Sequence, residues 1–320
     1  MTRMMLVSLA AALLVAMSSL QAAECAHRGA LSDRYCDSDH DLIADVDAER
    51  LLDPRALIFA YTPVEDPAVY KEVWSEFLAH LSDATGKRVV FFPVQSNAAQ
   101  VEAMRAGRLH VAGFNTGSTP LAVNCAGFVP FAMMAASDNS FGYEMEIVTH
   151  PSSGINTVAD LRGKTVAFSS PTSNSGFKAP SAILEAEFGL IGGTDYAFVF
   201  SGKHDNTLLG VVNRDYPAGA MANSVKTRML ARGVVNPSDI KVIYTSRTFP
   251  TTAFGHVNGL EPDLAKKVRA AFMSFDWTGT RLLAEFAKSG EEQFVPISYK
   301  KHWEVVRQID VASEVTYGCR

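Results

Sequence analysis

The feature that most constrains the fold is a regular alternation of short apolar strands and helices that begins at Ala56. A buried-type strand over 57–61 is followed by a helical stretch over 68–85, whose apolar residues recur with helical spacing. Two further strand–helix pairs follow, with strands over 88–94 and 109–114. Strands that alternate with helices predict a parallel sheet with right-handed crossovers.

The alternation restarts after a strand-like run over 143–149, and the further strands are expected over 165–168, 196–200, 218–222 and 241–244. A mature chain of roughly 300 residues exceeds the size at which a single core stops growing. We therefore expect an α/β fold of two lobes, each a mostly parallel sheet flanked by helices, with a two-strand hinge. The expected parts are a signal peptide (1–23), an N-terminal extension with an acidic loop (24–55), lobe 1 (56–148 plus 246–320) and lobe 2 (149–245).

Residues 1–23 have the pattern of a secretory signal: a charged start, a short apolar run and small residues before a cleavage site near Ala22 or Ala23. The apolar run is too short to span a membrane. The alternative is a lipoprotein acylated at Cys25, but this needs a small residue before the cysteine, where Glu24 stands. We therefore expect an exported protein of the periplasm.

Polar side chains gather directly after four of the predicted strands. In parallel sheets, ligands bind beyond the carboxyl ends of strands, where helix N-termini present free N–H groups. Hydroxyls and main-chain N–H groups suit a small oxyanion, because they donate several hydrogen bonds without a full counter-charge. Helix capping explains any one such turn, whereas four turns that converge on one cleft favour an oxyanion site. The positions are Thr62, Asn115, Thr116, Gly117, Ser118, Thr172, Ser173, Asn174, Ser175 and His204.

Catalytic and nucleic-acid functions find little support in the sequence. No Gly-x-Ser-x-Gly motif is present, and the histidines lack the spacing of metal ligands. The net charge of −5 is spread out and leaves no basic patch. We expect a binding protein with no nucleic-acid partner; the competing hypothesis is an enzyme of the same fold that uses the pair His204 and Asp205 as a base.

The four cysteines are Cys25, Cys36, Cys125 and Cys319. In an oxidising compartment they can form two disulfides, with three connectivities. Cys25 and Cys36 are close enough in sequence to pair locally.

An acidic loop follows Cys36. Asp37, Asp39, Asp41 and Asp45 occupy positions 1, 3, 5 and 9 of a calcium-type loop. Leu42 replaces the usual glycine at position 6, and there is no glutamate at position 12. Structural calcium is the only cofactor that the sequence suggests, and a solvated acidic turn is the alternative.

The strings FAYTPVEDPAVY, GRLHVAGFNTGSTP, PTSNSGF and GKHDNT resemble, in order and spacing, the phosphonate- and phosphite-binding periplasmic proteins of ABC importers. The resemblance covers about residues 55–300 and implies a two-lobe, type II binding-protein fold. It implies ligand groups at Tyr61 and Thr62, at the turns 115–118 and 172–175, and at His204. Many relatives carry an acidic residue in the stretch that here reads YPAGAMAN (216–223), so an aminophosphonate is disfavoured as the ligand.

Cys125 is a second departure from the family pattern. A thiol is a strong ligand for soft, trivalent arsenic, and the chain resembles the arsenite-sensing branch of this family. That resemblance implies capture of arsenite through Cys125 and a signal to a membrane sensor kinase that regulates arsenite oxidation. The alternatives for Cys125 are a buried structural cysteine or a disulfide with Cys319. The alternative function is the substrate-binding component of an ABC importer, with its permease as partner, for phosphite, phosphate or phosphonate.

Overall fold

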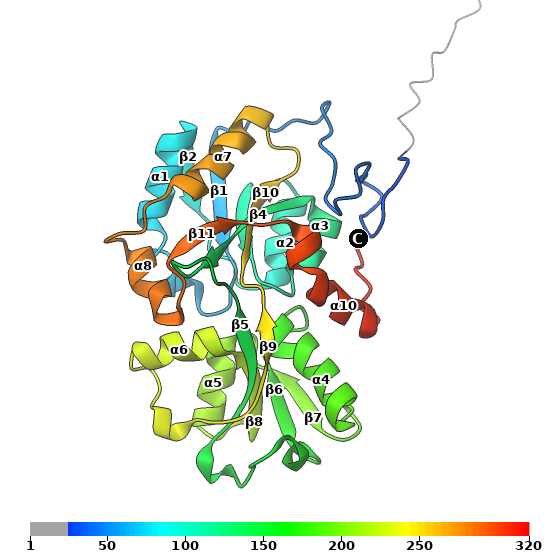
Figure 1. Cartoon of the computed structure of the whole chain (residues 1–320), viewed down its shortest axis with the longest axis vertical. Coiled ribbons are helices and arrows are strands. Elements are labelled where there is room, and N and C mark those ends of the chain that lie inside the picture. Colours follow the sequence, from blue (N-terminus) through cyan, green and yellow to red (C-terminus); the bar gives the residue numbers. More distant parts are fainter. Residues whose placement is uncertain (1–24, 320) are drawn as a thin grey trace, which may run out of the picture.

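The computed structural model describes residues 25–319, so the predicted signal peptide and its cleavage site near Ala22 or Ala23 lie outside the described residues. Two mixed sheets flanked by helices form two lobes; in Figure 1 one lobe combines blue to cyan with orange to red elements, and the other is green to yellow. We call lobe 1 the part built on the six-stranded sheet, of order β11-β4-β10-β3-β1-β2. Lobe 2 is built on the five-stranded sheet, of order β7-β6-β8-β5-β9.

Lobe 1 takes its elements from both ends of the chain. Its strands are β1 (Ala56–Tyr61), β2 (Arg88–Phe91), β3 (Val111–Phe114), β4 (Phe128–Ala135), β10 (Ala253–Val257) and β11 (Gln293–Pro296). Its helices are η1 (Pro67–Val69), α1 (Ser75–Thr85), α2 (Asn97–Arg105), α3 (Thr119–Ala126), α7 (Pro262–Ser274), α8 (Arg281–Phe286), η6 (Ala287–Ser289), α9 (Tyr299–His302) and α10 (Glu304–Ala312).

Lobe 2 is continuous in sequence. Its strands are β5 (Tyr143–Thr149), β6 (Thr165–Phe168), β7 (Ala197–Phe200), β8 (Ala218–Ala222) and β9 (Lys241–Phe249). Its helices are η2 (Pro151–Ser153), η3 (Val158–Leu161), the π-helical turn η4 (Asn174–Lys178), α4 (Ala179–Phe188), α5 (His204–Val212), α6 (Asn223–Ala231) and η5 (Pro237–Asp239).

The predicted strand–helix alternation produces the parallel part of each sheet. In lobe 1, β1 pairs in parallel with β2 and β3, and in lobe 2, β6 pairs in parallel with β7 and β8. The strands next to the crossings are antiparallel to their neighbours: β10 to β3 and β4, and β5 to β8 and β9. The carboxyl ends of the parallel strands in both lobes therefore face the crossing region.

The chain crosses between the lobes after β4 and again after β9 (Figure 1). Strand β5 pairs with β9 from end to end and with β8 over 145–149, so residues 143–148, which the sequence-based boundaries placed in lobe 1, lie in the sheet of lobe 2. The same holds for residues 246–249 at the end of β9. The two connections are thus the short segments 136–142 and 250–252.

Each lobe has its own apolar core. In lobe 1, the rings of Trp74 and Phe77 pack against those of Phe254 in β10 and Phe294 in β11. In lobe 2, a second cluster lies around β5, β6 and β8. None of the helices in the described part of the chain has both the length and the apolar character needed to cross a membrane.

Both ends of the described chain pack against lobe 1. The segment 25–55 forms turns and loops, closed by a Cys25–Cys36 disulfide and joined to the lobe by a bridge between Leu52 and Leu260. The C-terminal tail after α10 runs back to α3, where Cys319 forms a disulfide with Cys125. Figure 1 shows the C-terminus beside the N-terminal loops.

Candidate functional site

A small cavity lies between the two lobes. Its volume of about 40 Å³ exceeds the ~10–15 Å³ that one water requires, so it suits a ligand of only a few heavy atoms. Its lining comes from both lobes and from the connection 250–252. The lining residues are Tyr61, Val64, Asn115, Thr116, Tyr143, Ser173, Asn174, Ser175, His204, Ala222, Ser224, Val225, Arg228, Thr251, Thr252 and Glu291.

Four helix N-termini meet at this cavity. Thr116 lies just before α3, Ser175 lies in the first turn of η4, His204 is the first residue of α5 and Ser224 is the second residue of α6. The first-turn N–H groups of a helix have no partner within the helix and carry partial positive charge. Convergence of several such ends makes a site for an anion that needs no dedicated counter-ion.

Seven of the sequence-predicted ligand residues line the cavity. They are Tyr61, Asn115, Thr116, Ser173, Asn174, Ser175 and His204. Thr62 and Thr172 are absent from its lining and instead meet at Asn97: Thr62 Oγ1 donates to Asn97 Oδ1 (3.3 Å), and Asn97 Nδ2 donates to Thr172 Oγ1 (3.1 Å).

Gly117 and Ser118 also lie beside the cavity without lining it. Ser118 has structural bonds: its main-chain N–H donates to Asn115 Oδ1 (2.8 Å) and its hydroxyl to the Asn115 carbonyl (3.3 Å). Gly117 lies where the lobes touch, because a Cβ atom there would be 2.3 Å from the Asn174 nitrogen and 2.4 Å from the Thr172 oxygen.

The hydrogen bonds of Ser173 and His204 determine which of their atoms donate. The main-chain N–H of Ala222 donates to His204 Nδ1 (3.3 Å), so Nε2 carries the ring proton and faces Ser173 Oγ at 3.3 Å. The N–H of Gly176 also donates to Ser173 Oγ (3.0 Å). With both acceptor positions of this oxygen engaged, its O–H is left to donate to a ligand.

The tyrosines of the cavity stay protonated. Burial raises the pKa of Tyr61 and of Tyr143, so both phenols are O–H donors at neutral pH. Asn174 Nδ2 donates to the Tyr143 hydroxyl oxygen (3.2 Å). Asn174 Oδ1 is buried with no partner among the described residues, so the cavity also offers an acceptor for a ligand hydroxyl.

Arg228 is the one lysine or arginine among the described residues that line the cavity, and its charge is already compensated. Its guanidinium lies 3.2 Å from Glu65 and 3.8 Å from both Glu285 and Glu291. Burial raises the pKa of Glu291, and Arg228 partly offsets this. Arg232 and Lys288 complete the cluster, in which three carboxylates face three cations. Affinity for an anion must therefore come chiefly from the neutral donors.

The structure is in a closed state, because many polar contacts join the lobes around the cavity. The His204 N–H of lobe 2 donates to the Val64 carbonyl of lobe 1 (3.1 Å). On the opposite side, Lys178 Nζ donates to the Gly117 carbonyl (2.9 Å) and pairs with Asp310 of α10 (2.8 Å). The Glu65–Arg228 pair also spans the two lobes.

Cys125 does not reach the cavity, so its predicted position beside the cleft is wrong. It lies in the last turn of α3, whereas the cavity is at the N-terminal end of that helix. Its sulfur is buried and bonded to Cys319, so no free thiol is present for arsenite. The local Cys25–Cys36 pairing uses the other two cysteines.

The burial of His204 predicts that the folded protein is less stable in acid than at neutral pH. The pKa of His204 falls from 6.5 to about 4, chiefly because burial disfavours the charged ring. The native state then binds fewer protons than the unfolded chain, so stability is full above the unfolded pKa and falls as the pH drops towards the folded one. As the pH falls from about 7 to about 5, His204 should lower the free energy of unfolding by roughly 2 kcal/mol.

Urea unfolding of the wild-type protein and of His204→Gln at both pH values measures this term. We expect a smaller acid loss in the variant, since glutamine does not titrate. An equal loss in both proteins would show that His204 is not the group responsible.

The comparisons with known proteins agree with this geometry. The sequence model of the family described as "ABC transporter, phosphonate, periplasmic substrate-binding protein" matches residues 59–303. The chain is 28% identical over 229 residues to the phosphate-import protein PhnD of Mycolicibacterium smegmatis. The aligned part covers 68% of this chain and 71% of that protein.

Two solved structures share the fold. A binding protein component of an ABC phosphonate transporter from Pseudomonas aeruginosa superposes with a TM-score of 0.74 at 20% identity, covering 82% of this chain and 88% of the other. PhnD1 of Prochlorococcus marinus, in complex with methylphosphonate, superposes with a TM-score of 0.72 at 18% identity, covering 82% of this chain and 99% of the other. The predicted two-lobe, type II fold is therefore confirmed.

The matched family consists of binding proteins, which confirms the prediction that the chain is not an enzyme. The match spans both lobes, from Phe59 in β1 to Trp303. The chain thus belongs to the family of periplasmic substrate-binding proteins of ABC phosphonate transporters.

Proposed function

We propose that this protein delivers a small phosphorus oxyanion without an amine group, namely phosphite, phosphate or a short alkylphosphonate, to an ABC permease. The observation that carries the proposal is the convergence of four helix N-termini and neutral O–H and N–H donors on one small cavity. Such donors bind the oxygens of a tetrahedral anion, and the buried Asn174 Oδ1 can accept from a P–OH group.

Among the described residues that line the cavity, no carboxylate is free of a cation partner, which favours a ligand without an amine. Ala222 lines the cavity and belongs to the stretch 216–223, in which many relatives carry an acidic residue. Glu291 also lines the cavity, but Arg228 lies 3.8 Å from it and already offsets its charge. A buried ammonium group would therefore lack a dedicated partner, which is costly.

Arsenite is the competing ligand. The hypothesis of capture through Cys125 requires a thiolate, and Cys125 is bonded to Cys319. The signal to a sensor kinase rests on the same hypothesis, so the permease is the partner that we propose.

Calorimetric titration of the oxidised protein tests this choice. We expect methylphosphonate, phosphite or phosphate to bind at one site per chain. We expect 2-aminoethylphosphonate to bind at least about tenfold more weakly than methylphosphonate, because its ammonium group loses water without gaining a carboxylate. Arsenite should give no heat of binding. Binding of arsenite, with none of the phosphorus oxyanions bound, would contradict the proposal.

A further inference from the structure

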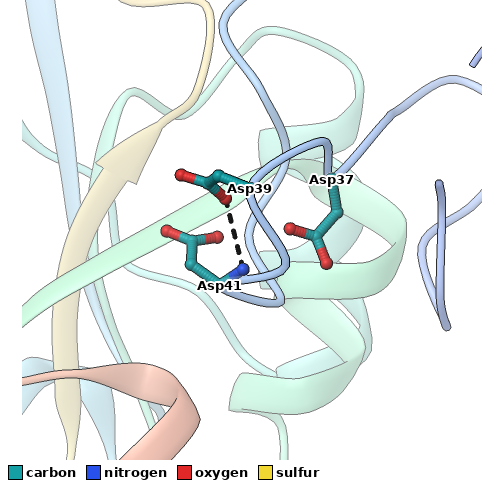
Figure 2. Close-up of side chains that lie close together, drawn as sticks. All are labelled: Asp37, Asp39 and Asp41. Carbon is teal, nitrogen blue, oxygen red and sulfur yellow. Dashed lines mark hydrogen bonds between the residues drawn. The ribbon is translucent and has the colours of Figure 1, made fainter. Parts of the chain in front are cut away.

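A second site, independent of the oxyanion cavity, lies in the N-terminal extension. Figure 2 shows Asp37, Asp39 and Asp41 on one tight loop, with the carboxylates of Asp39 and Asp41 side by side and that of Asp37 across the loop from them. Each offers one oxygen within 4.8 Å of the others. Asp39 and Asp41 are exposed, but Asp37 is fully buried.

Asp37 is the observation that points to a bound cation. Its Oδ2 accepts from the Leu42 N–H (3.2 Å) and lies 3.6 Å from His27 Nδ1. Its Oδ1 is buried with no hydrogen-bond partner among the described residues. A buried carboxylate oxygen without a partner is costly, and a metal ion in the loop would satisfy it.

The surrounding charges leave the loop negative. Within residues 25–319, neither Asp39 nor Asp41 forms an ion pair with a lysine or arginine, although Asp37 has the histidine described above. The nearest basic groups have other partners: Lys300 Nζ donates to the His40 carbonyl (2.9 Å), and Arg269 donates to His256 Nε2 (3.2 Å). Asp39 and Asp41 thus have no ion-pair partner among the described residues, and the partner of Asp37 is a histidine, which is charged only when protonated.

We propose that this loop binds Ca²⁺ through Asp37, Asp39 and Asp41. An all-oxygen, irregular loop suits calcium better than magnesium, which requires near-ideal octahedral geometry and gives up water reluctantly. Leu42, at the position where such loops usually have glycine, adopts the left-handed conformation that the turn requires (φ 71°). Asp45 does not join the three carboxylates; its Oδ2 accepts from the N–H (2.9 Å) and hydroxyl (2.7 Å) of Ser38.

The ion would fasten the extension to lobe 1. Asn258 Nδ2 in lobe 1 donates to the Asp45 carbonyl (3.0 Å), and the Lys300 bond to His40 holds the loop from a second direction. None of the three aspartates lines the oxyanion cavity. Calcium should therefore raise thermal stability and leave the affinity for the transported ligand unchanged.

Thermal unfolding after removal of metal by a chelator tests the proposal. With no glutamate at position 12, we expect a weak site, with a Kd of about 10⁻⁴–10⁻³ M, so CaCl₂ should raise the Tm by a few degrees at millimolar concentrations. MgCl₂ at equal ionic strength should have a much smaller effect. The double variant Asp39→Asn/Asp41→Asn, which changes only exposed side chains, should lose the shift, and Asp33→Asn, an exposed aspartate outside the cluster, should keep it.

Calorimetry on the wild-type protein tests the calcium site without any variant, so a folding defect in a variant cannot affect the result. We expect CaCl₂ to bind at one site per chain, with the same Kd for methylphosphonate before and after saturation with calcium. Equal Tm shifts from MgCl₂, an unchanged shift in the double variant, or no heat of calcium binding would overturn the calcium site. None of these outcomes bears on the oxyanion cavity, which is tested separately.

Discussion

Replacement of Gly117 by alanine is expected to weaken the binding of methylphosphonate by roughly 10- to 100-fold, because it prevents full closure of the lobes. The added Cβ atom would lie 2.3 Å and 2.4 Å from main-chain atoms of Asn174 and Thr172. Both atoms belong to lobe 2, whereas Gly117 belongs to lobe 1, so the contact can be relieved by opening of the cleft. These main-chain atoms cannot move aside on their own, as the end of a flexible side chain could, so the whole lobe must shift.

The ligand-free Gly117→Ala variant should unfold at nearly the wild-type temperature, because each lobe keeps its core. Gly318→Ala is the matched control, since a Cβ atom there meets nothing within 4 Å. Calorimetry gives the affinities, and small-angle scattering reports whether the ligand still makes the molecule more compact. An affinity of Gly117→Ala within twofold of wild type would show that contact at this glycine is not needed for binding.

Removal of the Ser173 hydroxyl is expected to have an effect of similar size. A hydrogen bond to a charged group contributes about 1.5–3 kcal/mol, so Ser173→Ala should weaken methylphosphonate binding by roughly 10- to 150-fold. The hydroxyl donor is fixed by the two bonds that Ser173 Oγ accepts, from Gly176 and from His204. The variant therefore loses a donor that the apoprotein has already oriented.

Ser173 also caps the turn η4, so a loss of stability must be separated from a loss of affinity. Thr157→Ala removes a capping side chain of η3, in the same lobe but away from the cavity. We expect both variants to lose up to about 1 kcal/mol of stability, but only Ser173→Ala to lose affinity. Equal affinities in the two variants would remove Ser173 from the binding site.

Local patterns were sufficient to predict the parallel half of each sheet. The apolar runs at β1, β3, β6 and β8 are short and bounded by turn residues, which is typical of buried parallel strands. Strands β4 and β10 were missed because they lie outside the strand–helix alternation that marks the parallel strands; they pair antiparallel with each other, and β10 also pairs antiparallel with β3. The expected helix over 68–85 is divided into η1 and α1, with Trp74 buried at the start of α1.

The site was predictable only where its residues follow a strand in sequence. Asn115, Ser173 and His204 do so, and all three line the cavity. Arg228 and Glu291 were missed, because a long-range ion cluster assembled from both lobes leaves no local pattern. Tyr143 and Thr251 could have been found by examining the residues at the two connections, because Tyr143 is the first residue of β5 and Thr251 lies in the connection 250–252.

Cys125 was predicted to border the cavity, but it does not line it. Its distance in sequence from the turn 115–118 suggested a place at the cleft, but one helix separates the two positions, and α3 carries Cys125 to its far end. The pairing with Cys319 depends on the return of the C-terminal tail to α3, across 194 residues of sequence. Pairing at this distance is a property of the tertiary fold.

A crystal structure of the protein grown with methylphosphonate tests the central claim most directly. We predict one phosphonate between the lobes, with its oxygens at hydrogen-bond distance, about 2.7–3.2 Å, from Ser173 Oγ and from donors of lobe 1 next to α3. A phosphonate bound outside the interlobe cavity, or held mainly by Arg228 after its carboxylate partners have moved away, would contradict binding by neutral donors.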